Sequence, residues 1–454
     1  MKRKQLARLN HWFCKKRRKP LILRGARQVG KSTLVRLFAE EQGLDLIEIN
    51  LERHRSLDSL FAEFDVDAIL KSIQSITEKK IGEKPLLFLD EIQATPHAIA
   101  ALRYFYEDRP SLAVIAAGSL MEFTLADHSF SMPVGRVEYL HIGPMTFSEY
   151  LQAVDAYTYE EFLAWTWGED LPLVTHKKLL MHQRHFLLTG GMPEAVDVYR
   201  ESQSFIEVSE VQGNICNTYL DDFSKYAKNR DLTELQSLFR GIPAHIGRKV
   251  KYTALLPEAT SLRTKDLLSL LERAQVISLS VKTNANGIPL GAESDPKFRK
   301  PIFLDVGLVS HLLGLNVRSL EQARDKALIN EGPLAEQFIG QHLFWEYHSQ
   351  PELYYWARES RKSNADLDYI VNMGGRILPI EVKAGVSGTL KSLHQFMYEK
   401  NGIYALRFDL NPPSIQTIAT VIKTATGTAE VSYKLVSLPL YAVEKITSFI
   451  EPLL

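Results

Sequence analysis

Residues 25–32 read GARQVGKS, a complete G-x-x-x-x-G-K-[ST] phosphate-binding loop. This pattern constrains the fold because such a loop joins a buried strand to a helix whose N-terminus faces the phosphate. An apolar run at residues 20–24 precedes the loop, and a helical pattern at residues 33–40 follows it. We therefore expect an α/β domain in which Gly25 and Gly30 permit the backbone conformation of the loop.

The loop residues share the work of holding a nucleoside triphosphate. Main-chain N–H groups surround the phosphates, Lys31 reaches the β and γ phosphates, and the Ser32 hydroxyl ligates Mg²⁺. We predict ATP and Mg²⁺ as cofactors. The cofactor-binding segment is Gly25, Ala26, Arg27, Gln28, Val29, Gly30, Lys31, Ser32 and Thr33.

An acidic pair follows a second buried strand. Residues 86–89 read LLFL and end in Asp90 and Glu91, which is the Walker B pattern. The carboxyl end of that strand delivers Asp90 to the Mg²⁺ shell, and Glu91 is placed to polarise a water molecule against the γ-phosphate. The sequence therefore predicts ATP hydrolysis as well as ATP binding.

Two further residues complete the predicted nucleotide site. Ser119 follows an apolar strand at residues 112–117, where a small polar group can sense the γ-phosphate. Arg136 lies on a predicted loop and could supply positive charge to a phosphate, in cis or from a neighbouring subunit. Arg103 and Arg109 are alternative candidates for that role. We leave open whether the protein forms a homo-oligomer.

Composition excludes several classes of protein. A chain of 454 residues suggests about three domains. Two cysteines far apart argue against a disulfide framework, and no apolar run approaches a bilayer span, so we expect a cytoplasmic protein without a membrane partner. Nine Lys and Arg in residues 1–20 indicate either a nucleic-acid contact arm or a solvated helix, and we favour the helix.

Five motifs occur in an order that makes the chain resemble a bacterial and archaeal group of AAA-type ATP-binding proteins. They are GARQVGKST, LLFLDEIQ, AAGSLMEF, PVGRVEYLHIGPMTFSEYL and LTGGMPEAV. The resemblance covers nearly the whole chain and implies an ATPase sheet with helices on both faces, followed by a small helical lid. The C-terminal region of this group is poorly understood.

The middle of the chain has the pattern of a winged helix. A helical run at residues 266–274 precedes a strand at 276–281, a polar segment at 283–295 and a second strand at 300–304. Residues 240–300 hold eleven Lys or Arg against five Asp or Glu, which suits contact with nucleic acid, and we favour DNA over RNA. Winged helices also bind proteins, so this alternative stays open.

The C-terminal region has the spacing of a phosphodiester-cleaving site. A predicted helix at residues 331–345 carries Glu336, and a predicted hairpin brings Asp368 towards Glu381. Because the side chains of a strand alternate between its two faces, Glu381 and Lys383 lie on the same face. The carboxylates would hold Mg²⁺, with Glu336 as an additional ligand, and Lys383 would activate water and offset phosphate charge.

This ordered set resembles the PD-(D/E)XK nuclease superfamily. Twelve residues separate Asp368 from Glu381-Val382-Lys383, and Leu367 replaces the proline of the superfamily's Pro-Asp pair. Asp366 is the rival first carboxylate. A nuclease fold can persist without activity, so cleavage is a separate question.

We therefore predict an α/β protein with a P-loop AAA-type ATPase domain (1–150), a helical lid (151–208), a winged helix (209–316) and a restriction-nuclease-like domain (317–454). Our leading hypothesis is an ATP-dependent switch that repositions the C-terminal module on nucleic acid. One alternative is an ATP-sensing DNA- or protein-binding adaptor with an inert nuclease fold. The other is a metal nuclease that cleaves without ATP.

Overall fold

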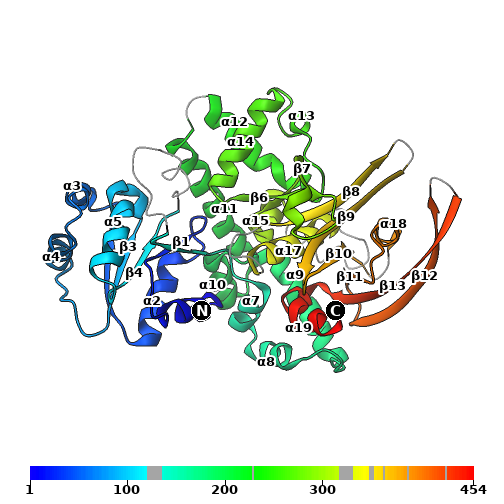
Figure 1. The fold of residues 1–454 in the computed structure, drawn as a ribbon, viewed down its shortest axis with the longest axis horizontal. Helices are drawn as coiled ribbons and strands as arrows, with labels where there is room; N and C mark the ends of the chain where they lie inside the picture. Colours follow the sequence, from blue (N-terminus) through cyan, green and yellow to red (C-terminus); the bar gives the residue numbers. More distant parts are fainter. Residues whose placement is uncertain are drawn as a thin grey trace. The chain divides into compact units, whose positions relative to one another are not determined.

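The computed structural model describes residues 1–119, 135–227, 230–315, 331–346, 352–360, 363–385, 388–424 and 427–454. The chain forms two compact units. The first unit is Met1–Met145 with Arg273–Val276, and the second is Thr146–Glu272 with Ile277–Leu454. Figure 1 colours them along the sequence from blue to red. Among the helices in the described ranges, none has the length and hydropathy that crossing a bilayer requires.

The described strands of the first unit form one parallel sheet in the order β2-β3-β4-β1-β5. The strands are β1 (Leu21–Arg24), β2 (Asp45–Asn50), β3 (Pro85–Asp90), β4 (Ala113–Ala117) and β5 (Glu138–His141). Strand β4 is buried along its whole length, as expected where helices cover both faces of a parallel sheet. The carboxyl ends of β1 and β3 share one sheet edge, with β4 between them.

Helices and short 3₁₀ turns surround this sheet. They are α1 (Gln5–Phe13), α2 (Lys31–Gln42), η1 (Arg55–Leu57), α3 (Asp58–Ala62), α4 (Val66–Thr77), η2 (Ile92–Ala94) and α5 (Pro96–Asp108). The Asp65 side chain starts α4 by accepting hydrogen bonds from the N–H groups of Asp67 and Ala68. The buried face of α4 carries Ile69 and Ile73.

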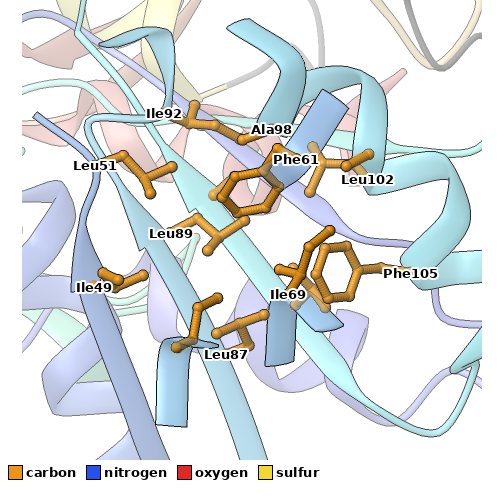
Figure 2. Packing of buried hydrophobic residues seen from close by; sticks show 14 of the residues in the cluster. Ile49, Leu51, Phe61, Ile69, Leu87, Leu89, Ile92, Ala98, Leu102 and Phe105 are labelled. Atoms are coloured by element: carbon orange, nitrogen blue, oxygen red, sulfur yellow. The ribbon is translucent and has the colours of Figure 1, made fainter. Parts of the chain in front are cut away.

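A hydrophobic core packs on one face of the sheet. Figure 2 shows Phe61, Leu102 and Phe105 from the helices packed over Leu87 and Leu89 of β3. Each of these side chains is almost completely buried. Apolar burial of this extent is the main term that holds an α/β layer together, and Asp90 follows the buried Leu89 as the last residue of β3.

The second unit is built on a mixed sheet of eight described strands, in the order β12-β13-β11-β10-β9-β8-β6-β7. The strands are β6 (Ile277–Thr283), β7 (Ser294–Phe303), β8 (Tyr354–Ser360), β9 (Ser363–Met373), β10 (Arg376–Val382), β11 (Tyr404–Asp409), β12 (Ser414–Thr424) and β13 (Gly427–Pro439). The β6–β7 hairpin contains the strands that we predicted for the winged helix. It joins the C-terminal strands through parallel pairing of β6 with β8.

The described helices of the second unit precede, interrupt and follow that sheet. They are α7 (Phe147–Val154), α8 (Ala156–Ala164), α9 (Leu173–Thr189), α10 (Pro193–Ser202), α11 (Phe205–Asp222), η3 (Phe223–Lys225), α12 (Arg230–Gly241), η4 (Ile242–His245), α13 (Tyr252–Leu255), α14 (Ser261–Arg273), η5 (Leu290–Glu293), α15 (Val306–Leu312), α17 (Glu331–Glu346), α18 (Lys391–Lys400), η6 (Leu440–Lys445), α19 (Ile446–Ile450) and η7 (Glu451–Leu453).

The helices that we predicted as a lid pack against the C-terminal part of the chain. Phe147 of α7 contacts the rings of Phe186, Phe338 and Tyr441, which come from α9, α17 and η6. The main-chain N–H of Phe147 also donates to the His342 ring on α17. Helices α7–α10 therefore group with the C-terminal sheet in the second unit.

A buried aspartate connects the Gly-Gly turn after α9 to α15. The Asp305 carboxylate accepts hydrogen bonds from the N–H groups of Gly191, at 2.6 Å, and of Gly307 and Leu308. A Cβ atom on Gly190 would lie 1.9 Å from the Asp305 carboxylate, so that position has to be glycine. Gly190 thus permits the close approach in which Gly191 bonds to Asp305, 114 positions away in the sequence.

Candidate functional site

The phosphate-binding loop of the first unit lies between β1 and α2, as the motif predicts. Gly30 is left-handed (φ 87°) and directly precedes α2, and Gln28 also has a positive φ of 62°. The Lys31 ammonium donates to the main-chain oxygens of Gly25 and Ala26, at 2.9 and 2.8 Å. Burial lowers the pKa of Lys31 to about 8, against the opposing effect of the nearby carboxylates of Glu91 and Asp90.

The first glycine of the loop packs against the chain that follows β5. A Cβ atom at Gly25 would lie 2.3 Å from the main-chain oxygen of Ile142. Ala26 and Val29 are buried inside the loop, whereas Thr33 on α2 is exposed. Glycine at position 25 therefore allows a close approach of two main chains.

Of the two acidic residues predicted at the end of β3, Asp90 contacts the residue that ends the loop motif. The Ser32 hydroxyl donates to Asp90 Oδ2 at 2.9 Å. Burial raises the pKa of Asp90, and the Ser32 hydrogen bond opposes that rise. Glu91 has a left-handed backbone (φ 51°), and its carboxylate accepts a 2.5 Å hydrogen bond from Gln93. Strain of this kind in a residue other than glycine is frequent at functional sites.

The structure places Ser119 and Arg136 differently with respect to the loop. Ser119 lies just beyond β4, the strand between β1 and β3, and its buried hydroxyl has no hydrogen-bond partner among the described residues. Arg136 forms an ion pair with Glu107 of α5 at 2.9 Å, and Arg103 shares that carboxylate. Arg109 pairs instead with Asp67 of α4.

Sequence reasoning missed one residue that contacts the loop. Arg3 is buried and donates to the main-chain oxygens of Val29, at 2.8 Å, and Gly143, at 2.9 Å. Leu9 and Trp12 of α1 are buried, in line with a helix at the basic N-terminus. No local pattern distinguishes Arg3 from the other basic residues of this segment, because its partners lie 26 and 140 positions away.

The second unit gathers the residues that we predicted for a nuclease-like site. In the β9–β10 hairpin Tyr369 pairs with Ile380, which brings Asp368 towards Glu381. The N–H of Val382 donates to Asp368 Oδ2 at 2.7 Å, and the Lys383 ammonium contacts Glu381 Oε1 at 2.5 Å. Burial raises the pKa of Asp368, and burial followed by the Asp368 charge raises that of Glu381 to about 7.

Helix α17 adds Glu336 to this group. Burial and the Asp368 charge raise the pKa of Glu336 well above its ordinary value, against the opposing effect of Lys300. The Glu336 carboxylate also lies against Gly247, where an added Cβ atom would come within 2.7 Å of it. The structure therefore brings Glu336, Asp368, Glu381 and Lys383 into one cluster, and Lys300 connects the rival carboxylate Asp366 to it.

A second lysine in the cluster comes from β7 and was not predicted. The Lys300 ammonium lies 2.9 Å from Asp366 Oδ1 and 4.0 Å from Asp368 Oδ1. Burial lowers the pKa of Lys300, but the charges of Asp368, Asp366 and Glu336 outweigh burial and raise it. Lys300 precedes Asp366 by 66 positions, and nothing in the local sequence points to that pairing.

Residues 17–151 match the family model of an AAA domain. The first unit therefore contains an AAA-type P-loop ATPase domain. Residues 181–319 and 331–426 match two further models, each described as a domain of unknown function. No curated protein matches the sequence.

Solved structures resemble the chain at low identity. The Walker-type ATPase PABY2304 of Pyrococcus abyssi is 17% identical, with a TM-score of 0.43 over 69% of this chain and 95% of that chain. The Aeropyrum pernix ORC2 protein in ADPNP–ADP complexes is 13% identical, with a TM-score of 0.35 over 71% and 93%. C. elegans PCH-2 is 14% identical, with a TM-score of 0.26 over 44% and 60%. The assignment of the AAA domain rests on the match over residues 17–151.

The residues of the AAA domain fit a magnesium ion bound with nucleotide. Mg²⁺ prefers oxygen ligands and usually takes one or two carboxylates together with phosphate oxygens. The adjacent Ser32 hydroxyl and Asp90 carboxylate supply such oxygens beside the loop. The side chains present at this position therefore fit such an ion.

The carboxylate cluster of the second unit contains one buried oxygen that lacks a partner. Glu381 is 6% exposed, and its Oε2 has no hydrogen-bond partner among the described residues. A buried carboxylate oxygen of this kind needs a proton or a cation. Even so, no three described His, Cys, Asp or Glu side chains lie close enough to coordinate one ion in this arrangement. Lysine ammonium groups instead contact the carboxylates.

Proposed function

We propose that this protein binds and hydrolyses ATP with Mg²⁺ in its AAA domain, and that the nucleotide state controls a nuclease-like second unit on nucleic acid. The observation that carries the first part is the Ser32–Asp90 hydrogen bond, which joins the phosphate-binding loop to the strand that bears Glu91. Glu91 follows Asp90 directly, so the proposed catalytic carboxylate is adjacent in sequence to the proposed metal ligand.

Each residue has a distinct role in the proposed reaction. The loop N–H groups and Lys31 would hold the phosphates and offset their charge. Ser32 and Asp90 would ligate Mg²⁺, which supplies electrostatic stabilisation of the transferred phosphoryl group when bound. Glu91 would orient the attacking water, and Ser119 would contact the γ-phosphate. Arg136 would act from a neighbouring subunit if the protein forms a homo-oligomer.

Turnover of ATP by purified protein tests this proposal. Lys31→Ala should abolish nucleotide binding, whereas Glu91→Gln should retain binding and lower turnover by about a hundredfold or more. Lys71→Ala is the matched control, because Lys71 is an exposed lysine on α4 of the same unit. Wild-type protein that binds neither ATP nor GTP would refute the proposal.

For the second unit we propose a nuclease-like module that acts on DNA. The convergence of Glu336, Asp368, Glu381 and Lys383 supports this proposal, because carboxylates can hold a divalent cation and a neighbouring lysine can offset phosphate charge. The basic segment 247–251 borders the same cluster, since Lys249 lies 3.9 Å from Asp366 and Gly247 contacts Glu336. Positive charge beside a carboxylate site suits a polyanionic substrate.

Cleavage of plasmid and linear DNA with Mn²⁺ tests the nuclease-like module. Asp368→Ala and Lys383→Ala should each abolish cleavage, and Glu430→Ala, an exposed acidic position on β13, should not. Equal cleavage by all four proteins would point to a contaminating nuclease. Absence of cleavage with ATP-dependent gel shifts would favour the adaptor with an inert fold.

A further inference from the structure

Strand β7 places a buried positive charge inside the carboxylate cluster. Lys300 is 5% exposed, and its ammonium group lies 2.9 Å from Asp366 and 4.0 Å from Asp368. The same group lies 5.0 Å from the ring of Tyr355 on β8. Burying an ammonium group is costly unless partners compensate its charge, and these two carboxylates supply that compensation.

The cluster is already partly neutralised by its own side chains. Lys300 contacts Asp366 and Asp368, and Lys383 contacts one oxygen of Glu381. The other buried oxygen of Glu381 has no hydrogen-bond partner among the described residues. Lys300 therefore lies beside Asp368, at the position where a cation bound by that carboxylate would lie. The Glu381 oxygen without a partner belongs to the neighbouring strand β10.

We propose that the Lys300 ammonium group occupies the position beside Asp366 and Asp368 that a divalent cation would take, and competes with that cation. This inference rests on the proposed nuclease-like site. It adds that a residue from the β6–β7 hairpin sets the metal affinity of the site. Movement of β7 or of the Lys300 side chain would then free Asp368 to share a cation with Glu381.

Direct titration with Mn²⁺, with free Mn²⁺ measured by electron paramagnetic resonance, tests the competition. All variants carry Asp90→Asn, so that the AAA domain does not contribute a Mn²⁺ site. Lys300→Met should bind Mn²⁺ at least tenfold more tightly than the protein with Lys300 intact, and a further Asp368→Asn should remove that gain. Lys282→Met, on β6 of the same hairpin, is the matched control and should leave the affinity unchanged.

The possible outcomes distinguish competition by Lys300 from the existence of the metal site itself. If Lys300→Met leaves the affinity unchanged while Asp368→Asn still weakens Mn²⁺ binding, the competition is refuted and the metal site stands. If Asp368→Asn changes nothing in either background, both fail. Lys300→Gln is a second variant that should disturb the fold less than Lys300→Met, because its side-chain amide can still donate a hydrogen bond to Asp366. Mn²⁺ should raise its melting temperature by several degrees more than that of the Lys300 protein, and equal shifts would refute the competition.

Discussion

The Ser32 hydroxyl donates a 2.9 Å hydrogen bond to the Asp90 carboxylate across 58 positions of sequence. Ser32 follows β1 and Asp90 ends β3, and β4 lies between those strands in the sheet. The contact therefore depends on strand order as well as on the two motifs. It fixes the oxygens that we assign to Mg²⁺ at one edge of the sheet.

Replacing Ser32 by alanine should separate binding of the nucleotide from binding of its metal. Ser32→Ala removes one metal ligand and leaves the loop N–H groups and Lys31 in place. We expect ATP affinity without Mg²⁺ to change less than about threefold and Mg²⁺-dependent turnover to fall about a hundredfold, the loss typical of one transition-state contact. Calorimetry with and without Mg²⁺ checks this. An unchanged dependence of turnover on Mg²⁺ would contradict the assignment.

Arg3 should contribute to the stability of the phosphate-binding loop. Arg3→Ala removes two hydrogen bonds from a charged donor and leaves the oxygens of Val29 and Gly143 without that partner. We expect the free energy of unfolding to fall by about 2–4 kcal/mol and the KM for ATP to rise. Urea unfolding and steady-state kinetics measure both. Lys2→Ala, at an exposed neighbouring position, serves as the control and should change neither.

Gly25→Ala should destabilise the first unit through a steric clash. The new methyl group would approach the main-chain oxygen of Ile142 to 2.3 Å unless the backbone shifts. Accommodation of such a group costs about 1–3 kcal/mol, and the displaced loop should also bind ATP more weakly. Thermal unfolding and nucleotide titration measure these effects. Gly241→Ala, where the added methyl group meets open space, should be nearly neutral.

Asp305 should make stability depend on pH. Burial raises its pKa to about 6, although three main-chain N–H groups oppose the rise. A folded-state pKa above that of the unfolded chain means that the stabilising contribution is present at low pH and is lost as pH rises through 6. Between pH 5 and pH 7.5 wild type should lose about 1.4 kcal/mol relative to Asp305→Asn, equivalent to one pKa unit.

Urea unfolding of both proteins across this pH range provides the measurement. Asp305→Asn should be the less stable protein at every pH, because an amide NH₂ would face main-chain donors. A constant difference between the two proteins would mean that Asp305 does not titrate in this window.

The segment 247–251 should contribute electrostatically to DNA binding. Arg248 and Lys251 are exposed, and neighbouring Val250 bonds to the main-chain oxygen of Arg299 on β7. Replacing both basic residues by alanine should weaken binding to all DNA sequences similarly and lower the salt dependence by about two counterions. Fluorescence anisotropy at several salt concentrations measures the slope. An unchanged slope would place the DNA contact elsewhere.

The local parts of the fold were predictable from the sequence. The phosphate-binding loop, the strand that ends in Asp90 and the β9–β10 hairpin all lie where the patterns place them. Each is encoded within about twenty residues, either by glycine and lysine spacing or by alternation around a turn. The same spacing brought Asp368, Glu381 and Lys383 onto one hairpin.

Pairing between distant segments was not predictable in the same way. The run at residues 300–304 indicates a strand, but it shows neither which sheet β7 joins nor that Lys300 reaches Asp366. The aromatic residues of α7 indicate a buried helix face, but not that this face packs against α17. Such contacts depend on how whole elements pack, which no local pattern records.

The shared sheet also limits how this protein could have evolved by exchange of parts. Strands β6 and β7 precede helix α17 in sequence, yet they form the end of the sheet that carries Asp368 and Glu381. A recombination event that joined a foreign middle segment to residues 331–454 would remove Lys300 and expose the hydrogen-bonding edge of β8. The segment that carries β6 and β7 and residues 331–454 should therefore be inherited together.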